Sequence, residues 1–175
     1  MERTIIPTQR QVNARLVPTG DPISIAAGSF VTLTQALGGT YTVIHNGNMA
    51  RIDGQDADAL GFEPQVLDFK PSADGKVNLD QVNEAIASVY DPEIPVSVVA
   101  LGLIYCVAVD DQGKVTIEMT LTAPGCGMGP VLVQDITSRV NQVPFVSAVQ
   151  VDLVFEPPWS REMMSEEAQL ELGLF

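Results

Sequence analysis

The sequence predicts an α+β protein, in which a small β-rich segment precedes a two-layer α-β-β-α-β-α module with a small mixed sheet. Short apolar runs separated by glycines dominate the first part. In the second part, the apolar spacing of helices alternates along the chain with the apolar spacing of strands. The charge also differs between the two parts. Residues 1–70 carry five basic and seven acidic side chains, whereas residues 71–175 carry four basic and 15 acidic side chains. The turn-forming residues 71–75 separate the two parts, so we expect the β-rich segment at 1–71 and the module at 76–175.

In the first part, two apolar runs at residues 41–45 and 48–52 flank Asn46-Gly47. Asn-Gly favours a two-residue hairpin, because both central residues of a type I′ turn need a positive φ. Residues 28–34 predict a further strand. The simplest arrangement is a small twisted sheet or partial barrel.

A helix is predicted at the start of the second part. Apolar residues recur there at every third or fourth position: Leu79, Val82, Ile86 and Val89. Asn78 stands where it can cap the first turn, and Asp91-Pro92 ends the helix because proline disfavours helical backbone in the residue before it.

Three strands and two further helices follow. The strands are expected at residues 103–109, 115–121 and 149–155, with the first two paired as an antiparallel hairpin. Pro130 opens the helix between the second and third strands, and this helix returns the chain to the same sheet. Ser165 is expected to cap a last short helix.

Composition excludes several classes of partner. The 175 residues include nine Lys and Arg against 22 Asp and Glu, for a net charge of −13. Nucleic acids and anionic membranes are therefore not expected partners, since phosphates attract basic surfaces. No apolar run is continuous enough to cross a bilayer, and the N-terminus does not resemble a secretory signal. Two cysteines 20 positions apart form no disulfide framework, so a reduced, cytoplasmic protein is expected.

The most informative stretch is the Gly-rich loop that contains Cys126, between a predicted strand and the helix that Pro130 opens. The free N–H groups and the dipole of a helix N-terminus favour an anion, so a cysteine there tends toward the thiolate. A thiolate binds soft metals or attacks electrophiles. The alternative is an ordinary loop cysteine among turn glycines.

Asp91 and Glu93 lie two positions apart in a proline-rich loop. Their carboxylates could bind a hard cation, accept a proton or orient a thiol. The simpler interpretation is that Asp91 begins a turn and Glu93 is a solvated charge.

Three other residues receive structural interpretations. Cys106 lies within a strand pattern and is expected to be buried, since free cysteine is among the most buried residue types. His45, the single histidine, is expected at a surface turn, and Trp159 in packing. There is no C-x-x-C pair, so one chain cannot supply the four thiolates of a conventional cluster site.

Four motifs occur in order along residues 76–173. They are DPEIP at 91–95, LGLI at 101–104, TAPGC at 122–126 and PPW at 157–159, the last followed by Met164-Ser165. Together they resemble the iron–sulfur cluster assembly domain family, which includes cytosolic targeting factors and the PaaD component of a ring-hydroxylating system. Residues 28–30 and 56–61 resemble the N-terminal extension of the SufT branch of that family.

The resemblance implies a non-enzymatic accessory factor that assists insertion of iron–sulfur clusters into client proteins. It implies that Cys126 is the reactive or cluster-contacting thiol and that Asp91, Glu93 and Thr122 are polar residues around it. Cys126 alone is an incomplete ligand set, so iron or a cluster is expected to be held transiently, with no cofactor bound stably by one chain. The implied partners are the assembly machinery, client apoproteins and a second copy of the chain.

Two alternatives remain. In a thiol-dependent enzyme, Cys126 would be the nucleophile and Asp91 or Glu93 would assist it. In a docking subunit of a multicomponent oxygenase, as in PaaD, Trp159 and the surrounding acidic surface would form the interface.

Overall fold

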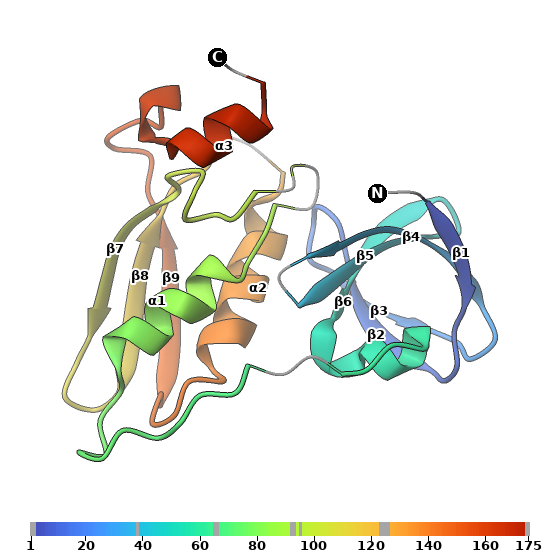
Figure 1. Cartoon of the computed structure of the whole chain (residues 1–175), viewed down its shortest axis with the longest axis horizontal. Helices are drawn as coiled ribbons and strands as arrows, with labels where there is room; N and C mark the ends of the chain where they lie inside the picture. Colours follow the sequence, from blue (N-terminus) through green and yellow to red (C-terminus); the bar gives the residue numbers. More distant parts are fainter. Residues whose placement is uncertain are drawn as a thin grey trace. The chain divides into compact units, whose positions relative to one another are not determined.

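The computed structural model describes residues 3–37, 39–64, 67–91, 94, 96–122 and 127–173 (Figure 1). The chain forms two compact units, Met1–Val66 and Leu67–Phe175. The first is β-rich and the second mixes helices with a small sheet, so the predicted fold class is confirmed. Within the described residues, no helix has the length and apolar character needed to cross a membrane.

The boundary between the units follows Val66, whereas the sequence places the division at residues 71–75. Two hydrogen bonds tie the intervening residues to the second unit. The Leu67 N–H donates to Oε1 of Gln142 at 3.4 Å, and Nε2 of Gln81 donates to the Lys70 carbonyl at 2.8 Å. The turn residues therefore lie inside the second unit, because tertiary contacts rather than composition define the boundary.

The first unit is a six-stranded antiparallel sheet with strand order β1-β4-β5-β6-β2-β3. Its elements are β1 (Thr4–Pro7), β2 (Val12–Leu16), β3 (Pro22–Ile25), β4 (Phe30–Leu37), β5 (Thr40–His45), β6 (Asn48–Asp53) and the 3-10 helix η1 (Gly54–Leu60). The Asn46-Gly47 hairpin is confirmed, since β5 pairs with β6 and the turn residues have φ values of 50° and 80°.

One hydrophobic core fills the first unit. Alternate residues of the strands and the apolar side of η1 bury it, chiefly Val12, Ile25, Val31, Val43, Ile52 and Leu60. The Asp53 carboxylate caps η1 by accepting a hydrogen bond from the Gln55 N–H at 3.2 Å, and Gly61 ends the helix in the left-handed conformation with a φ of 81°.

The second unit has the predicted order of helices and strands, with one additional 3-10 helix. Its elements are α1 (Leu79–Ala87), β7 (Ile104–Val109), β8 (Lys114–Met119), α2 (Gly129–Val140), β9 (Ala148–Leu153), η2 (Arg161–Met163) and α3 (Glu166–Glu171). Asn78 caps α1 as expected, because its side chain accepts from the Asp80 N–H at 2.9 Å.

Strand β8 is the centre of the second sheet. It pairs with β7 antiparallel and with β9 parallel, and α2 connects β8 to β9. Helices α1 and α2 lie on the same side of this sheet (Figure 1). Val115, Ile117 and Met119 of β8 are fully buried, whereas the alternating Glu118 is exposed. The sheet is therefore covered on one face.

The expectation that Cys106 is buried is wrong. Cys106 is exposed, because its position in β7 is paired with the exposed Glu118 of β8. A register shift between Ile104 and Cys106 sets this pairing. The strand pattern does not show which face of the sheet carries the exposed side chains, so it could not place the thiol in solvent.

Candidate functional site

Two of the four predicted site residues, Cys126 and Glu93, lie outside the described residues. The structure does describe Asp91, Thr122 and the elements that flank the cysteine loop. This loop begins after β8 and ends at Gly129, the first residue of α2. In the sequence, Cys126 is three residues before Gly129.

The N-terminus of α2 has the features of an anion-favouring helix end. Its N-cap residue, Met128, makes no side-chain capping hydrogen bond, Pro130 occupies the first turn, and the first turn contains no acidic residue. The first N–H groups of the helix therefore lack the usual capping oxygen of an N-cap side chain. The positive end of a helix dipole stabilises negative charge placed close to it.

Gly129 lets α2 start close against the sheet. A Cβ at this position would lie 3.2 Å from Cδ1 of Leu121 and 3.4 Å from Cδ1 of Leu153. Leu121 follows β8 and Leu153 ends β9, so the helix start meets the carboxyl ends of both parallel strands. Ligands of α/β sheets commonly bind at this edge.

Thr120 and Thr122 begin the cysteine loop in different environments. Thr122 is exposed, whereas Thr120 is 1% exposed. The Thr120 N–H donates to the Leu103 carbonyl at 2.8 Å and so fixes the start of the loop. Sequence reasoning missed Thr120, because a threonine at the end of an alternating strand carries no signal that it is buried.

Asp91 organises its own loop. Its N–H donates to the Val96 carbonyl at 3.1 Å, and its Oδ1 accepts from the Ile94 N–H at 3.1 Å. Tyr90 and Ser97 close the same loop as an isolated antiparallel bridge. The Asp91 carboxylate thus acts as a turn former, as the simpler sequence interpretation proposed.

Backbone hydrogen bonds link the Asp91 loop to the start of the cysteine loop. The Val98 N–H donates to the Val89 carbonyl at 3.0 Å, and the Leu103 N–H donates to the Val98 carbonyl at 3.1 Å. The Leu103 carbonyl then accepts from Thr120. The flanks of the two predicted stretches are therefore connected at the end of the sheet where β8 finishes.

Among the described residues, no group of three or more His, Cys, Asp and Glu side chains is placed to hold a metal ion. His45 does lie beside the β5–β6 turn, where its Nε2 and the Asn46 side-chain nitrogen are 3.1 Å apart. Trp159 is half-buried and hydrogen-bonded within the fold, which agrees with the packing interpretation.

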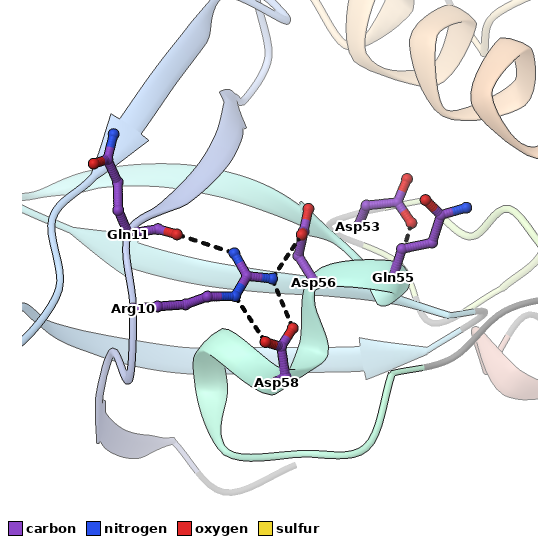
Figure 2. Close-up of polar contacts among 6 residues, drawn as sticks. All are labelled: Arg10, Gln11, Asp53, Gln55, Asp56 and Asp58. Atoms are coloured by element: carbon purple, nitrogen blue, oxygen red, sulfur yellow. Dashed lines mark hydrogen bonds and ion pairs between the residues drawn. The ribbon is translucent and has the colours of Figure 1, made fainter.

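A charged cluster in the first unit was not predicted (Figure 2). The Arg10 guanidinium donates to both carboxylate oxygens of Asp58 at 2.7 Å and to Oδ1 of Asp56 at 2.9 Å. These hydrogen bonds raise the pKa of Arg10 and lower that of Asp58. The 56–61 motif thus serves to fasten η1 to the chain before β2, over a sequence separation of 48 residues.

The family model for iron–sulfur cluster assembly proteins matches residues 79–153, which lie within the second unit. An Fe-S protein maturation auxiliary factor of Porphyromonas gingivalis is 50% identical over 94 residues, which cover 54% of this chain and 90% of that protein. The chain belongs to the iron–sulfur cluster assembly protein family.

Two further comparisons agree with this membership. The maturation auxiliary factor SufT of Staphylococcus aureus is 42% identical over 86 residues, covering 49% of this chain and 98% of the relative. A solved structure of a conserved hypothetical protein from Thermotoga maritima is 36% identical with a TM-score of 0.51, covering 57% of this chain and 97% of that one. The resemblance drawn from the four motifs is confirmed, and these relatives account for about half of the chain.

Proposed function

We propose that this protein is an accessory factor for iron–sulfur protein maturation, and that it assists insertion or transfer of clusters into client proteins through Cys126. The observation that supports this most directly is the position of Cys126, three residues before the uncapped N-terminus of α2 in the unit that matches the family. Relatives that cover 54% and 49% of this chain are named maturation auxiliary factors.

In this proposal Cys126 contacts the iron of the cargo as a thiolate, and the α2 N-terminus stabilises its negative charge. Asp91 shapes the neighbouring loop, while Glu93 and Thr122 supply polar groups near the thiol. Thiolates are the usual protein ligands of iron–sulfur clusters, and a cluster ordinarily takes four. The remaining ligands would come from a second chain, from the client or from a small thiol, so the contact is transient.

The protein would accordingly act without catalysis of its own. Its partners would be the assembly machinery and client apoproteins in the cytoplasm, where thiols stay reduced. Its role is to present one cargo-binding thiol on a stable α+β unit.

The chain contains its own matched control for a genetic test, because Cys106 is an exposed thiol outside the cysteine loop. In a cell that depends on this protein, Cys126→Ser should reduce the activities of iron–sulfur enzymes, and Cys106→Ser should not. Equal activities for Cys126→Ser and wild type would contradict the proposal.

Anaerobic purification gives a second readout. Iron, labile sulfide and visible absorption should be measured for wild type, Cys126→Ser and Cys106→Ser after reconstitution. Metal retained by wild type and Cys106→Ser but lost by Cys126→Ser would support cluster contact through Cys126, and its stoichiometry would report whether two chains share one cluster.

A further inference from the structure

The described residues of the second unit form a pocket beside β7 and β8 that the proposed thiol chemistry does not use. The pocket has a volume of about 570 Å³. Apolar groups from three parts of the second unit line it: Ile104 at the start of β7, Pro157 after β9, and Met163 in η2. Met163 is 36% exposed, so this apolar surface is in contact with solvent.

The walls of the pocket are held in place by hydrogen bonding and close packing. The Tyr105 hydroxyl donates to the Pro157 carbonyl at 2.8 Å and lies 3.6 Å from Sδ of Met163. Gly102 packs against the Met163 backbone so closely that a Cβ on Gly102 would lie 2.8 Å from the carbonyl carbon of Met163. A preformed pocket binds its occupant with little ordering cost.

Two carboxylates give the pocket its charge. Glu118 and Glu156 are exposed and line it, and no described lining residue is basic. The second unit as a whole carries five basic and 16 acidic side chains, a net charge of −11. This field disfavours a second copy of the same unit as the occupant and favours a cationic one.

We infer that this pocket docks an extended polypeptide segment of a partner protein, in which an arginine or lysine is flanked by apolar side chains. The cation would pair with Glu118 and Glu156, and its apolar neighbours would contact Ile104, Pro157 and Met163. Because the lining residues come from β7, β8 and the residues after β9, an extended chain can contact all of them. That the segment belongs to a client apoprotein rests on the proposed function, whereas the docking itself does not.

The test uses the full chain and a synthetic heptapeptide, GALRLAG, blocked at both ends. Binding is measured by calorimetry and mapped by amide chemical shifts on ¹⁵N-labelled protein. We expect shifts at Tyr105, Glu118 and Met163, and none at Glu84, which lies on α1. The acidic peptide GALELAG should not bind. The double variant Glu118→Gln/Glu156→Gln should bind GALRLAG about tenfold more weakly, because the affinity rests in part on charge pairing.

Glu84→Gln is the matched control, since it removes one exposed carboxylate from the helical side of the unit. It should bind GALRLAG with unchanged affinity. The inference is overturned if GALRLAG does not bind, if the double variant binds it as tightly as wild type, or if the shifts lie on α1 and α2. Both variants change exposed positions, and circular dichroism verifies that each is folded.

Cys126→Ser separates this inference from the proposed function. It should bind GALRLAG like wild type, and the double variant should alkylate at Cys126 at the wild-type rate. If GALRLAG binds normally and Cys126→Ser cells keep full iron–sulfur enzyme activities, the docking inference is supported and the proposed role of Cys126 is rejected. If GALRLAG does not bind the wild-type protein but Cys126→Ser cells lose iron–sulfur enzyme activities, only the docking inference is rejected.

Discussion

The indole Nε1 of Trp159 donates a hydrogen bond of 2.7 Å to the carbonyl oxygen of Leu101, across 58 positions of sequence. A second bond nearby, from the Ser165 N–H to the Ala100 carbonyl at 2.9 Å, holds the C-terminal segment to the same loop. That loop continues to Leu103, whose carbonyl positions Thr120 at the start of the cysteine loop. The C-terminal segment therefore stabilises the edge of the sheet where the cysteine loop begins.

Trp159→Phe should destabilise the second unit by at least about 1 kcal/mol, because the Leu101 carbonyl loses its donor and the phenyl ring fills less space than the indole. Urea unfolding followed by circular dichroism measures the change. Tyr105→Phe is the control, because it removes the hydroxyl that donates to the Pro157 carbonyl. That hydrogen bond is exposed, so water can replace the lost donor. A loss of stability for Trp159→Phe no larger than that for Tyr105→Phe would argue against a stabilising bond from Trp159 to Leu101.

Gly102→Ala should cost at least about 2 kcal/mol, since it combines a left-handed backbone with a collision. Gly102 has a φ of 76°, and an added Cβ would meet the carbonyl and Cβ of Met163. Gly75→Ala is a matched control in the same unit, because its φ is 70° and no atom lies within 4 Å of the added Cβ. Calorimetric melting should separate the two variants, and equal melting temperatures would contradict the packing described for Gly102.

Arg10→Met should raise the pKa of Asp58 toward its ordinary value, because the hydrogen bond from Arg10 is the main cause of its lowering. A carboxyl whose folded pKa is lowered contributes stability above its unfolded pKa, about 3.9 for aspartate, and loses that contribution as pH falls through the folded value. Acid unfolding of the first unit should therefore depend less on pH in Arg10→Met. Carbon NMR of the Asp58 carboxyl checks the titration, and an unchanged curve would exclude Arg10 as the cause.

The two thiols should differ in alkylation by iodoacetamide. Cys126→Ser leaves Cys106 alone, and this exposed thiol should react fully in the folded protein. Cys106→Ser leaves Cys126, whose reaction should persist to lower pH than that of an ordinary thiol with a pKa of about 8.5. Mass spectrometry at a series of pH values measures the alkylation rate of each thiol. Matching pH profiles for the two variants would contradict an electrostatic effect of the α2 N-terminus on Cys126.

Local patterns were sufficient for much of the fold. Asn46-Gly47 specified the β5–β6 hairpin through its need for two positive φ values. Asn78 specified the start of α1 through its capping oxygen. Each signal acts within a few residues, so no tertiary information was needed to interpret it.

Features that depend on distant parts of the chain were beyond such patterns. Arg10 meets Asp58 across 48 positions, and Cys106 is exposed on the side of β7 that it shares with Glu118 of β8. The boundary after Val66 likewise depends on contacts between distant positions, such as the hydrogen bond from the Leu67 N–H to Gln142 across 75 positions.

By itself, the sequence determined the order of helices and strands, the acidic character and the family motifs that single out Cys126, because these depend on neighbouring residues and composition. Only the tertiary structure decided that the Asp91 loop connects through Leu103 to the start of the cysteine loop, and that Glu118 and Glu156 share one pocket. Such proximity arises when hydrophobic burial packs one face of a sheet and leaves the other in water, and no local pattern records which residues then become neighbours.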